Sequence, residues 1–190
     1  MATKSGIFWV TWANAHAQNS SKIADLVEPF RSDATAFIAA LGAAGAKVEI
    51  TATKRSVRRA YLFHWSWKIA LGQCKASDAT KVPDVDILWD HGNDAASRQG
   101  AQEMVTGFGL AVPPRSVNPP ALTSNHITGL AVDMDVSWTG TINVTDKGAK
   151  TVAIAFIPNV NANINLHVVG ASYGVKKLVT DAPHWSHDGH

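Results

Sequence analysis

The sequence predicts an α+β fold in a single compact domain, with helices packed on a small antiparallel sheet. Segments with helical spacing of apolar side chains dominate up to residue 108, and short alternating segments dominate from residue 129 onward. This segregation is typical of α+β proteins. The chain has 190 residues, of which 46% are hydrophobic and 17% charged. That length and composition suit one domain, residues 1–190, with a buried core and no disordered tract.

The first part of the chain supplies one apolar segment, two helical regions and a strand. Residues 6–12 (GIFWVTW) are apolar and are interpreted as the first strand. Residues 21–45 show helical spacing in two pieces that meet at Pro29. Residues 47–53 alternate apolar and polar side chains, which predicts a strand. Residues 56–72 return to helical spacing and predict a helix.

The second part begins with a loop-like segment at residues 76–92 and a predicted helix at 94–108. A segment with four prolines follows and is interpreted as a structured loop. The remainder is predicted to form short strands interrupted by one short helix. The strands are expected at 129–138, 140–144, 151–156 and 175–179, and the helix at 161–170.

The predicted strand at 129–138 carries acidic residues opposite an apolar face. That apolar face consists of Leu130, Val132, Met134, Val136 and Trp138. Asp133 and Asp135 lie on the other face, where a buried carboxylate is costly unless it is paired or bound to a metal. His126 precedes the strand and is separated from it by Gly129, which is free to form a tight turn. Such a turn could return His126 to the side of Asp133.

These residue types indicate a metal site. A catalytic zinc ion needs three protein ligands and one open position, and His and Asp are both good zinc ligands. The single cysteine, Cys74, excludes a Cys-rich site. The segment DAPHW (181–185) offers His184 as a third ligand, with Asp181 placed to hold the attacking water and take its proton. Arg55 is the candidate cation for the developing oxyanion.

Three motifs resemble those of a known family. SNHITGLAVD (124–133) matches the Ser-x-His-x-x-Gly-x-Ala-x-Asp signature of the D-alanyl-D-alanine carboxypeptidase family of zinc peptidases. DAPHW is similar to that family's closing motif, in the form of the L-alanyl-D-glutamate endopeptidases of phage endolysins and bacterial wall enzymes. KRS (54–56) resembles the family's Tyr-Arg-Ser, with Lys54 in place of the tyrosine. The motifs occur in the family's order and lie within residues 54–185.

The resemblance implies a role for each of these residues. The implied ligands of one Zn²⁺ ion per chain are His126, Asp133 and His184. Asp181 would be the general base, Arg55 the cation that stabilises the transition state, and Ser124 a partner that supports the ligands. Arg58 and Arg59 are alternatives to Arg55, because the arginine motif departs from the family pattern.

The function implied is that of a zinc-dependent peptidase, which hydrolyses a bond in the peptidoglycan stem peptide. Both an endopeptidase, as in endolysins, and a D,D-carboxypeptidase fit the motifs. The alternative is a non-catalytic, zinc-bearing module that binds the cell wall, or a phage structural component of the same fold. Asp181 argues against that alternative, because a module that only binds has no need of a base.

Charge and hydropathy suggest no other kind of partner. The net charge of +2 gives no strong attraction to nucleic acid, and no apolar run approaches the roughly 20 residues that a membrane span needs. The N-terminal segment lacks a convincing signal peptide. We therefore expect a bacterial or phage protein that is made in the cytoplasm and acts on the cell wall. The bond cleaved and the oligomeric state are left open by the sequence.

Overall fold

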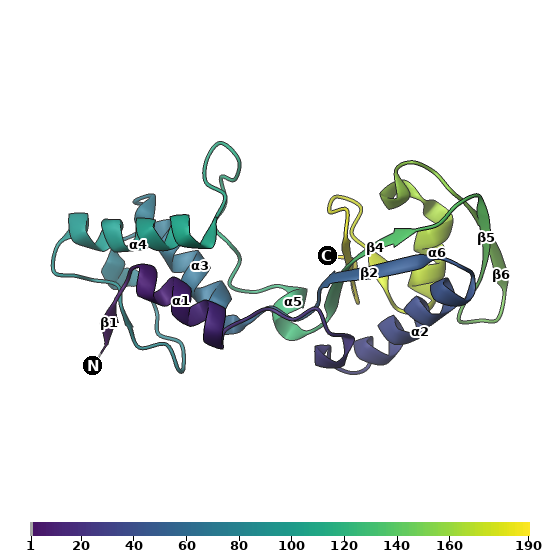
Figure 1. The fold of residues 1–190 in the computed structure, drawn as a ribbon, viewed down its shortest axis with the longest axis horizontal. Helices are drawn as coiled ribbons and strands as arrows, with labels where there is room; N and C mark the ends of the chain where they lie inside the picture. Colours follow the sequence, from purple (N-terminus) through teal and green to yellow (C-terminus); the bar gives the residue numbers. More distant parts are fainter. Residues whose placement is uncertain (1) are drawn as a thin grey trace. The chain divides into compact units, whose positions relative to one another are not determined.

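The computed structural model describes residues 2–190. The contacts within the chain group it into two compact units (Figure 1). The helical unit comprises the described residues up to Gln18 together with Ser56–Thr123, and the sheet unit comprises Asn19–Arg55 and Ser124–His190. Helices packed with small antiparallel sheets confirm the predicted α+β class. That all 190 residues form one peptidase domain stays a prediction.

The helical unit packs its helices around a core of its own. They are α1 (Ile7–His16), α3 (Val57–Ala70), α4 (Asp94–Phe108) and the short 3-10 helix η2 (Ala76–Asp78). The short strands β1 (Thr3–Lys4) and β3 (Ile87–Leu88) pair in parallel. Ser56 and Asn93 cap α3 and α4, because their side chains accept hydrogen bonds from the main-chain N–H groups of Arg59 and Ala96. The predicted helices at 56–72 and 94–108 are thus confirmed.

The interpretation of residues 6–12 as a strand is wrong, because α1 begins at Ile7, directly after Gly6, and includes residues 7–12. Trp9, Val10, Ala13 and Ala17 are buried, and their spacing is that of one face of a helix rather than of a strand. A short, continuously apolar run does not distinguish the two by its period, so the sequence pattern was ambiguous here.

The sheet unit is built on a four-stranded antiparallel sheet in the order β2-β4-β8-β7. Its strands are β2 (Lys47–Ala52), β4 (Ala131–Ser137), β7 (Lys176–Lys177) and β8 (His184–Ser186). A separate hairpin pairs β5 (Thr141–Thr145) with β6 (Thr151–Ala155). The helices of this unit are η1 (Ile23–Asp25), α2 (Phe30–Ala43), α5 (Asn125–Thr128), η3 (Val160–Ala162) and α6 (Ile164–Ser172).

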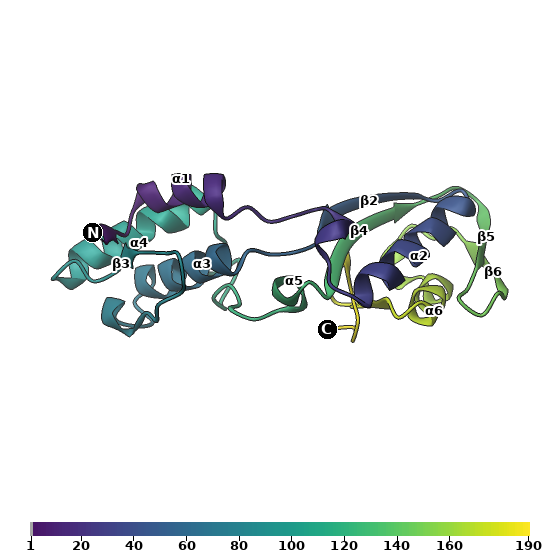
Figure 2. The same cartoon turned by 90° about the horizontal axis from the view of Figure 1, so that it is seen from below.

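Two helices, α2 and α6, cover one face of this sheet (Figure 2). The core between them includes Phe30, Phe37, Leu41, Val132, Met134, Leu166, Val169 and Trp185. Burial of each large apolar side chain contributes about 1.5–3 kcal/mol. Along β4 the predicted alternation is confirmed: Val132, Met134 and Val136 are buried, whereas Asp133 and Asp135 lie on the opposite face. The open face of the sheet therefore carries the acidic residues.

Gly129 forms the turn between α5 and β4. Its φ is 77°, in the left-handed region that favours glycine. A Cβ atom at this position would lie 3.2 Å from Cγ1 of Val27. The Gly129 carbonyl also accepts a hydrogen bond of 3.0 Å from the N–H of Val27. The turn that brings α5 to the start of β4 thus packs against the segment ahead of α2.

None of the helices described is both long and apolar enough to cross a membrane.

Gly129→Ala is expected to destabilise the protein more than Gly140→Ala. Gly140 has a similar φ of 66°, but a Cβ atom there would meet nothing within 4 Å. Both variants carry the conformational cost of about 1–2 kcal/mol for a left-handed residue, and only Gly129→Ala adds the contact with Val27. Urea denaturation measures the two free energies of unfolding. Equal losses would contradict the account of this turn.

Candidate metal centre

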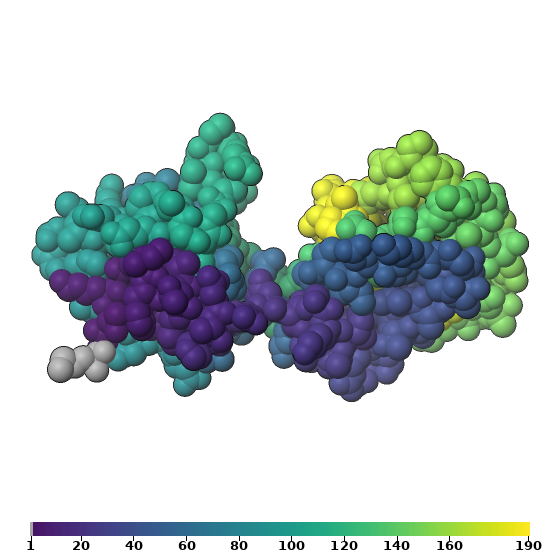
Figure 3. Space-filling model, in the orientation of Figure 1, coloured from purple at the N-terminus to yellow at the C-terminus, as the bar shows by residue number. Residues whose placement is uncertain are grey.

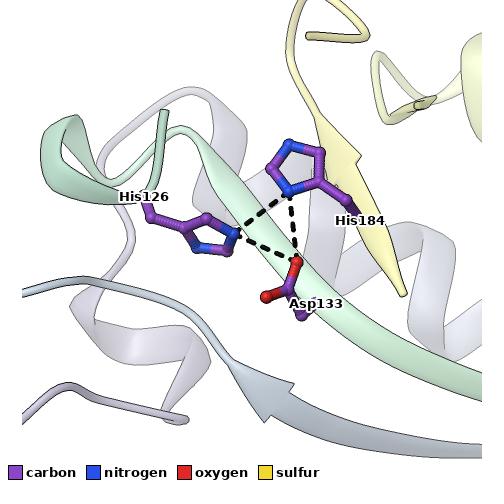
Figure 4. A group of neighbouring side chains, drawn as sticks. All are labelled: His126, Asp133 and His184. Carbon is purple, nitrogen blue, oxygen red and sulfur yellow. Dashed lines mark hydrogen bonds and ion pairs between the residues drawn. The ribbon is translucent and has the colours of Figure 1, made fainter. Parts of the chain in front are cut away.

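The side chains of His126, Asp133 and His184 converge on the open face of the sheet (Figure 4). Nε2 of His126 lies 3.0 Å from Oδ1 of Asp133 and 3.1 Å from Nδ1 of His184. Nδ1 of His184 lies 3.1 Å from the same carboxylate oxygen. The three atoms therefore form a nearly equilateral triangle, and this group is close enough to bind a metal ion.

Local structure explains why these side chains meet. Asp133 on β4 and His184 on β8 are register partners, so they lie directly opposite each other across the antiparallel pair. His126 lies on the one-turn helix α5, which Ser124 begins and Gly129 ends. Both histidines are buried, with 5% and 7% of their surface exposed, and the Asp133 side chain is 20% exposed.

The outward nitrogen of each imidazole contacts a main-chain oxygen. Nδ1 of His126 lies 2.5 Å from the carbonyl of Thr53, and Nε2 of His184 lies 3.1 Å from the main-chain oxygen of His190. A carbonyl can only accept, so each of these nitrogens donates its proton outward. In the neutral rings, Nε2 of His126 and Nδ1 of His184 then carry lone pairs that point toward Asp133.

Two lone pairs and a carboxylate oxygen that point at one another repel unless a positive charge, either a metal ion or a proton, lies between them. Tetrahedral coordination with metal–ligand distances of about 2.0–2.1 Å separates the ligand atoms by about 3.3 Å. The observed separations of 3.0–3.1 Å are within a few tenths of an ångström of that value. The residues present therefore fit a small divalent cation, with the outward hydrogen bonds fixing the ligand nitrogens.

Charge in the centre shifts the pKa values of its members. When the rings carry a proton on Nε2 of His126 and Nδ1 of His184, in place of a metal, these nitrogens donate to Asp133. Burial alone would raise the pKa of Asp133, but these hydrogen bonds outweigh it and hold the pKa well below its usual range. Burial lowers the pKa of His126, but its contacts with Asp133 and Thr53 outweigh this, and the net shift is upward. The carboxylate of Asp133 is thus ionised and ready to serve as a ligand.

The three candidate arginines lie in different surroundings. Arg55, at the end of the sheet unit's first segment, donates its main-chain N–H to the carbonyl of His126 at 3.0 Å. Burial and the contacts with Asp133 and Thr53 have the largest effects on the pKa of His126. The positive charge of Arg55 has a smaller effect and lowers this pKa. Its guanidinium is therefore within electrostatic reach of a ligand ring.

Arg58 and Arg59 instead make contacts within the helical unit. The guanidinium of Arg58 lies 5.9 Å from the ring centre of Trp12 and 3.9 Å from the carboxylate of Asp84. Arg59 donates hydrogen bonds to the carbonyl of Ala13 and to the side chain of Asn14. Both guanidinium groups thus have partners within the helical unit. Of the three arginines, Arg55 is therefore the best candidate for a role at the metal site.

Ser124 and Asp181 are placed differently from the ligands. The Ser124 hydroxyl caps α5 by accepting from the N–H of Ile127 at 3.3 Å, so it supports His126 through the backbone. Asp181 lies in an exposed turn, and its carboxylate makes no hydrogen bond or ion pair with another of the residues that the structure describes. Asp135 is exposed and does not join the metal group.

The residues that hold His184 in place were not predicted from the sequence. The main-chain oxygen of His190, which accepts from His184, also accepts from Nδ2 of Asn125 at 2.7 Å and from Oγ of Ser186 at 3.0 Å. The Asp188 carboxylate accepts from the same two donors. The last residues of the chain, drawn in yellow at the surface of the sheet unit in Figure 3, are thus tied to α5. Because every residue has a main-chain oxygen, the sequence gives no sign of which one accepts from His184.

Lys177 is the second group that the sequence did not single out. Its ammonium donates to the carbonyls of Leu178, Asp181 and His184, at 2.5 to 2.9 Å. Burial lowers the pKa of Lys177 to about 8, although the negative charges of Asp181 and Asp133 act to raise it. The carboxylates of both aspartates are therefore within electrostatic reach of one ammonium group.

No family model matches the chain, and neither a curated protein nor a solved structure matches it.

The centre is expected to bind one divalent ion per chain. His126→Ala or His184→Ala should weaken the affinity by more than about 100-fold, since loss of a supporting residue alone costs about 10–100-fold. Competition with a chromophoric chelator measures this affinity. His187→Ala is the control, because His187 is exposed and lies only three residues from His184. Parent affinity in both ligand variants would contradict the assignment.

Proposed function

We propose that this protein is a zinc peptidase that hydrolyses a bond in the stem peptide of peptidoglycan. The observation that carries the proposal is the convergence of His126, Asp133 and His184 at 3.0–3.1 Å. The motifs SNHITGLAVD and DAPHW supply these residues, and the two histidines are 58 positions apart in the sequence. The resemblance of both motifs to the D-alanyl-D-alanine carboxypeptidase family supports the substrate class.

Zinc is the metal that this ligand set favours. Two imidazole nitrogens and one carboxylate in a compact arrangement suit its tetrahedral preference, whereas magnesium and calcium favour oxygen ligands in larger shells. A zinc ion held by His126, Asp133 and His184 would still have room for water or substrate, as catalytic zinc sites do. When bound, zinc lowers the pKa of a coordinated water to about 7 and polarises a substrate carbonyl.

The chain's own residues supply the remaining parts of hydrolysis. Asp181 takes a proton from the attacking water and passes it to the amine that leaves when the C–N bond breaks. Its carboxylate is exposed and makes no hydrogen bond among residues 2–190, so no neighbouring group occupies its oxygens. Arg55 stabilises the negative charge that develops on the carbonyl oxygen.

Digestion of purified sacculi tests the proposal. The protein should release peptide fragments, a chelator should stop the release, and added zinc should restore it. The masses of the fragments identify the bond and separate an endopeptidase from a D,D-carboxypeptidase. If no wall type is cleaved while zinc still binds, a module that binds the wall without catalysis becomes the better account.

Asp181→Asn should lower turnover by about 10²–10⁴-fold, the usual contribution of a positioned base. The amide preserves size but cannot accept the proton, so zinc content and folding should be unchanged. Turnover and zinc content are measured on the same preparation. Loss of zinc together with activity would make Asp181 a ligand. Unchanged turnover would mean that another group activates the water.

Arg55→Ala should reduce kcat/KM by an amount equivalent to roughly 2.7–4 kcal/mol, the range for one oxyanion donor. Binding of an uncleaved stem-peptide analogue should change far less. Arg58→Ala and Arg59→Ala are the matched controls, since both side chains contact groups of the helical unit. A larger kinetic loss in Arg59→Ala than in Arg55→Ala would move the role to Arg59.

A further inference from the structure

The turn from Leu178 to His184 carries both a ligand and the candidate base. It follows β7 and leads into β8, and its main chain is bent twice. The N–H of Asp181 donates to the carbonyl of Leu178, and the N–H of His184 donates to the carbonyl of Asp181, both at 3.2 Å. Both distances lie at the upper end of the ordinary N–H···O range. The turn is also held by neighbouring elements, because Nδ2 of Asn161 donates to the carbonyl of Val179 at 2.8 Å and the N–H of Met134 donates to the carbonyl of Pro183 at 2.9 Å.

The two functional residues of the turn are held to different degrees. His184 is anchored by its pairing with Asp133 and by the hydrogen bond to His190. Asp181 is exposed, and no hydrogen bond within the described residues holds its side chain. The position of its carboxylate therefore depends on the main chain of the turn.

Lys177 binds that main chain from inside. Its ammonium contacts the carbonyls of Leu178, Asp181 and His184 at 2.7, 2.5 and 2.9 Å. All three ammonium protons are thus donated, and none remains for a substrate. The same group lies 5.5 Å from the ring centre of Trp185, which is buried in the core.

We propose that Lys177 is a positioning residue, which holds the 178–184 turn so that Asp181 stands at a fixed place beside the metal centre. The inference rests on the proposed function, because it assigns Asp181 the role of base. Three oxygens around one ammonium form a bracket that the planar fork of an arginine does not reproduce. The geometry of the contacts, rather than the charge alone, is therefore what the turn requires.

Hydrogen exchange in zinc-loaded protein tests the bracket without reference to activity. In Lys177→Met the amides of Asp181 and His184 should exchange at least about tenfold faster, since local opening becomes easier. Lys177→Arg should behave similarly although it keeps the charge. Lys176→Met is the control, because Lys176 is the exposed neighbour on the same strand. Parent exchange rates in Lys177→Met would overturn the proposal.

A double-mutant cycle tests the link to Asp181. Lys177→Met should lower kcat and leave zinc affinity within about threefold of the parent, because His184 keeps its other anchors. Combined with Asp181→Asn, it should lower kcat no further than Asp181→Asn does alone. If the double variant instead lost kcat by the product of the two single losses, Lys177 would not act through Asp181 and the assignment would be overturned. A parent without hydrolytic activity but with faster exchange in Lys177→Met would refute the proposed function and leave the bracket standing.

Discussion

The register between β4 and β8 is the constraint on which the candidate metal centre depends. It sets Asp133 opposite His184 and, one residue along, Val132 opposite Trp185. Because side chains alternate across a strand, the register that buries Val132 and Trp185 also places Asp133 and His184 on the open face. A slip of one residue would exchange the two sets, so the core that α2 and α6 bury also enforces the geometry of the ligands.

The third candidate ligand, His126, depends on a different set of contacts. His126 comes from a single helical turn, which is too short to be stable alone. Its position is fixed from outside: the Thr53 carbonyl accepts from its ring, and the main-chain N–H of Arg55 donates to its carbonyl. Residues just beyond β2 therefore hold the ring of a ligand that precedes β4. The sheet and the residues next to it thus support all three candidate ligands, as a preorganised metal site would require.

Some of this could be predicted from the sequence and some could not. The alternation of β4, the turn at Gly129 and the candidate ligands have signatures in residue type and spacing, and the structure brings these ligands together. The β8 strand is only three residues long, too short to show a period of two. The acceptors at Thr53 and His190 are main-chain oxygens, which every residue possesses. The choice among Arg55, Arg58 and Arg59 depends on where a strand gives way to a helix, and pattern alone locates such boundaries poorly.

X-ray absorption at the zinc edge of the purified protein tests the central claim most directly. The account predicts one tightly bound zinc with about four nitrogen or oxygen neighbours at about 2.0–2.1 Å. It also predicts outer-shell scattering from two imidazole rings. Each of the variants His126→Ala and His184→Ala should leave the scattering of one ring, or lose the zinc altogether. A shell of six oxygen neighbours without imidazole scattering, or a spectrum unchanged in both histidine variants, would contradict the account.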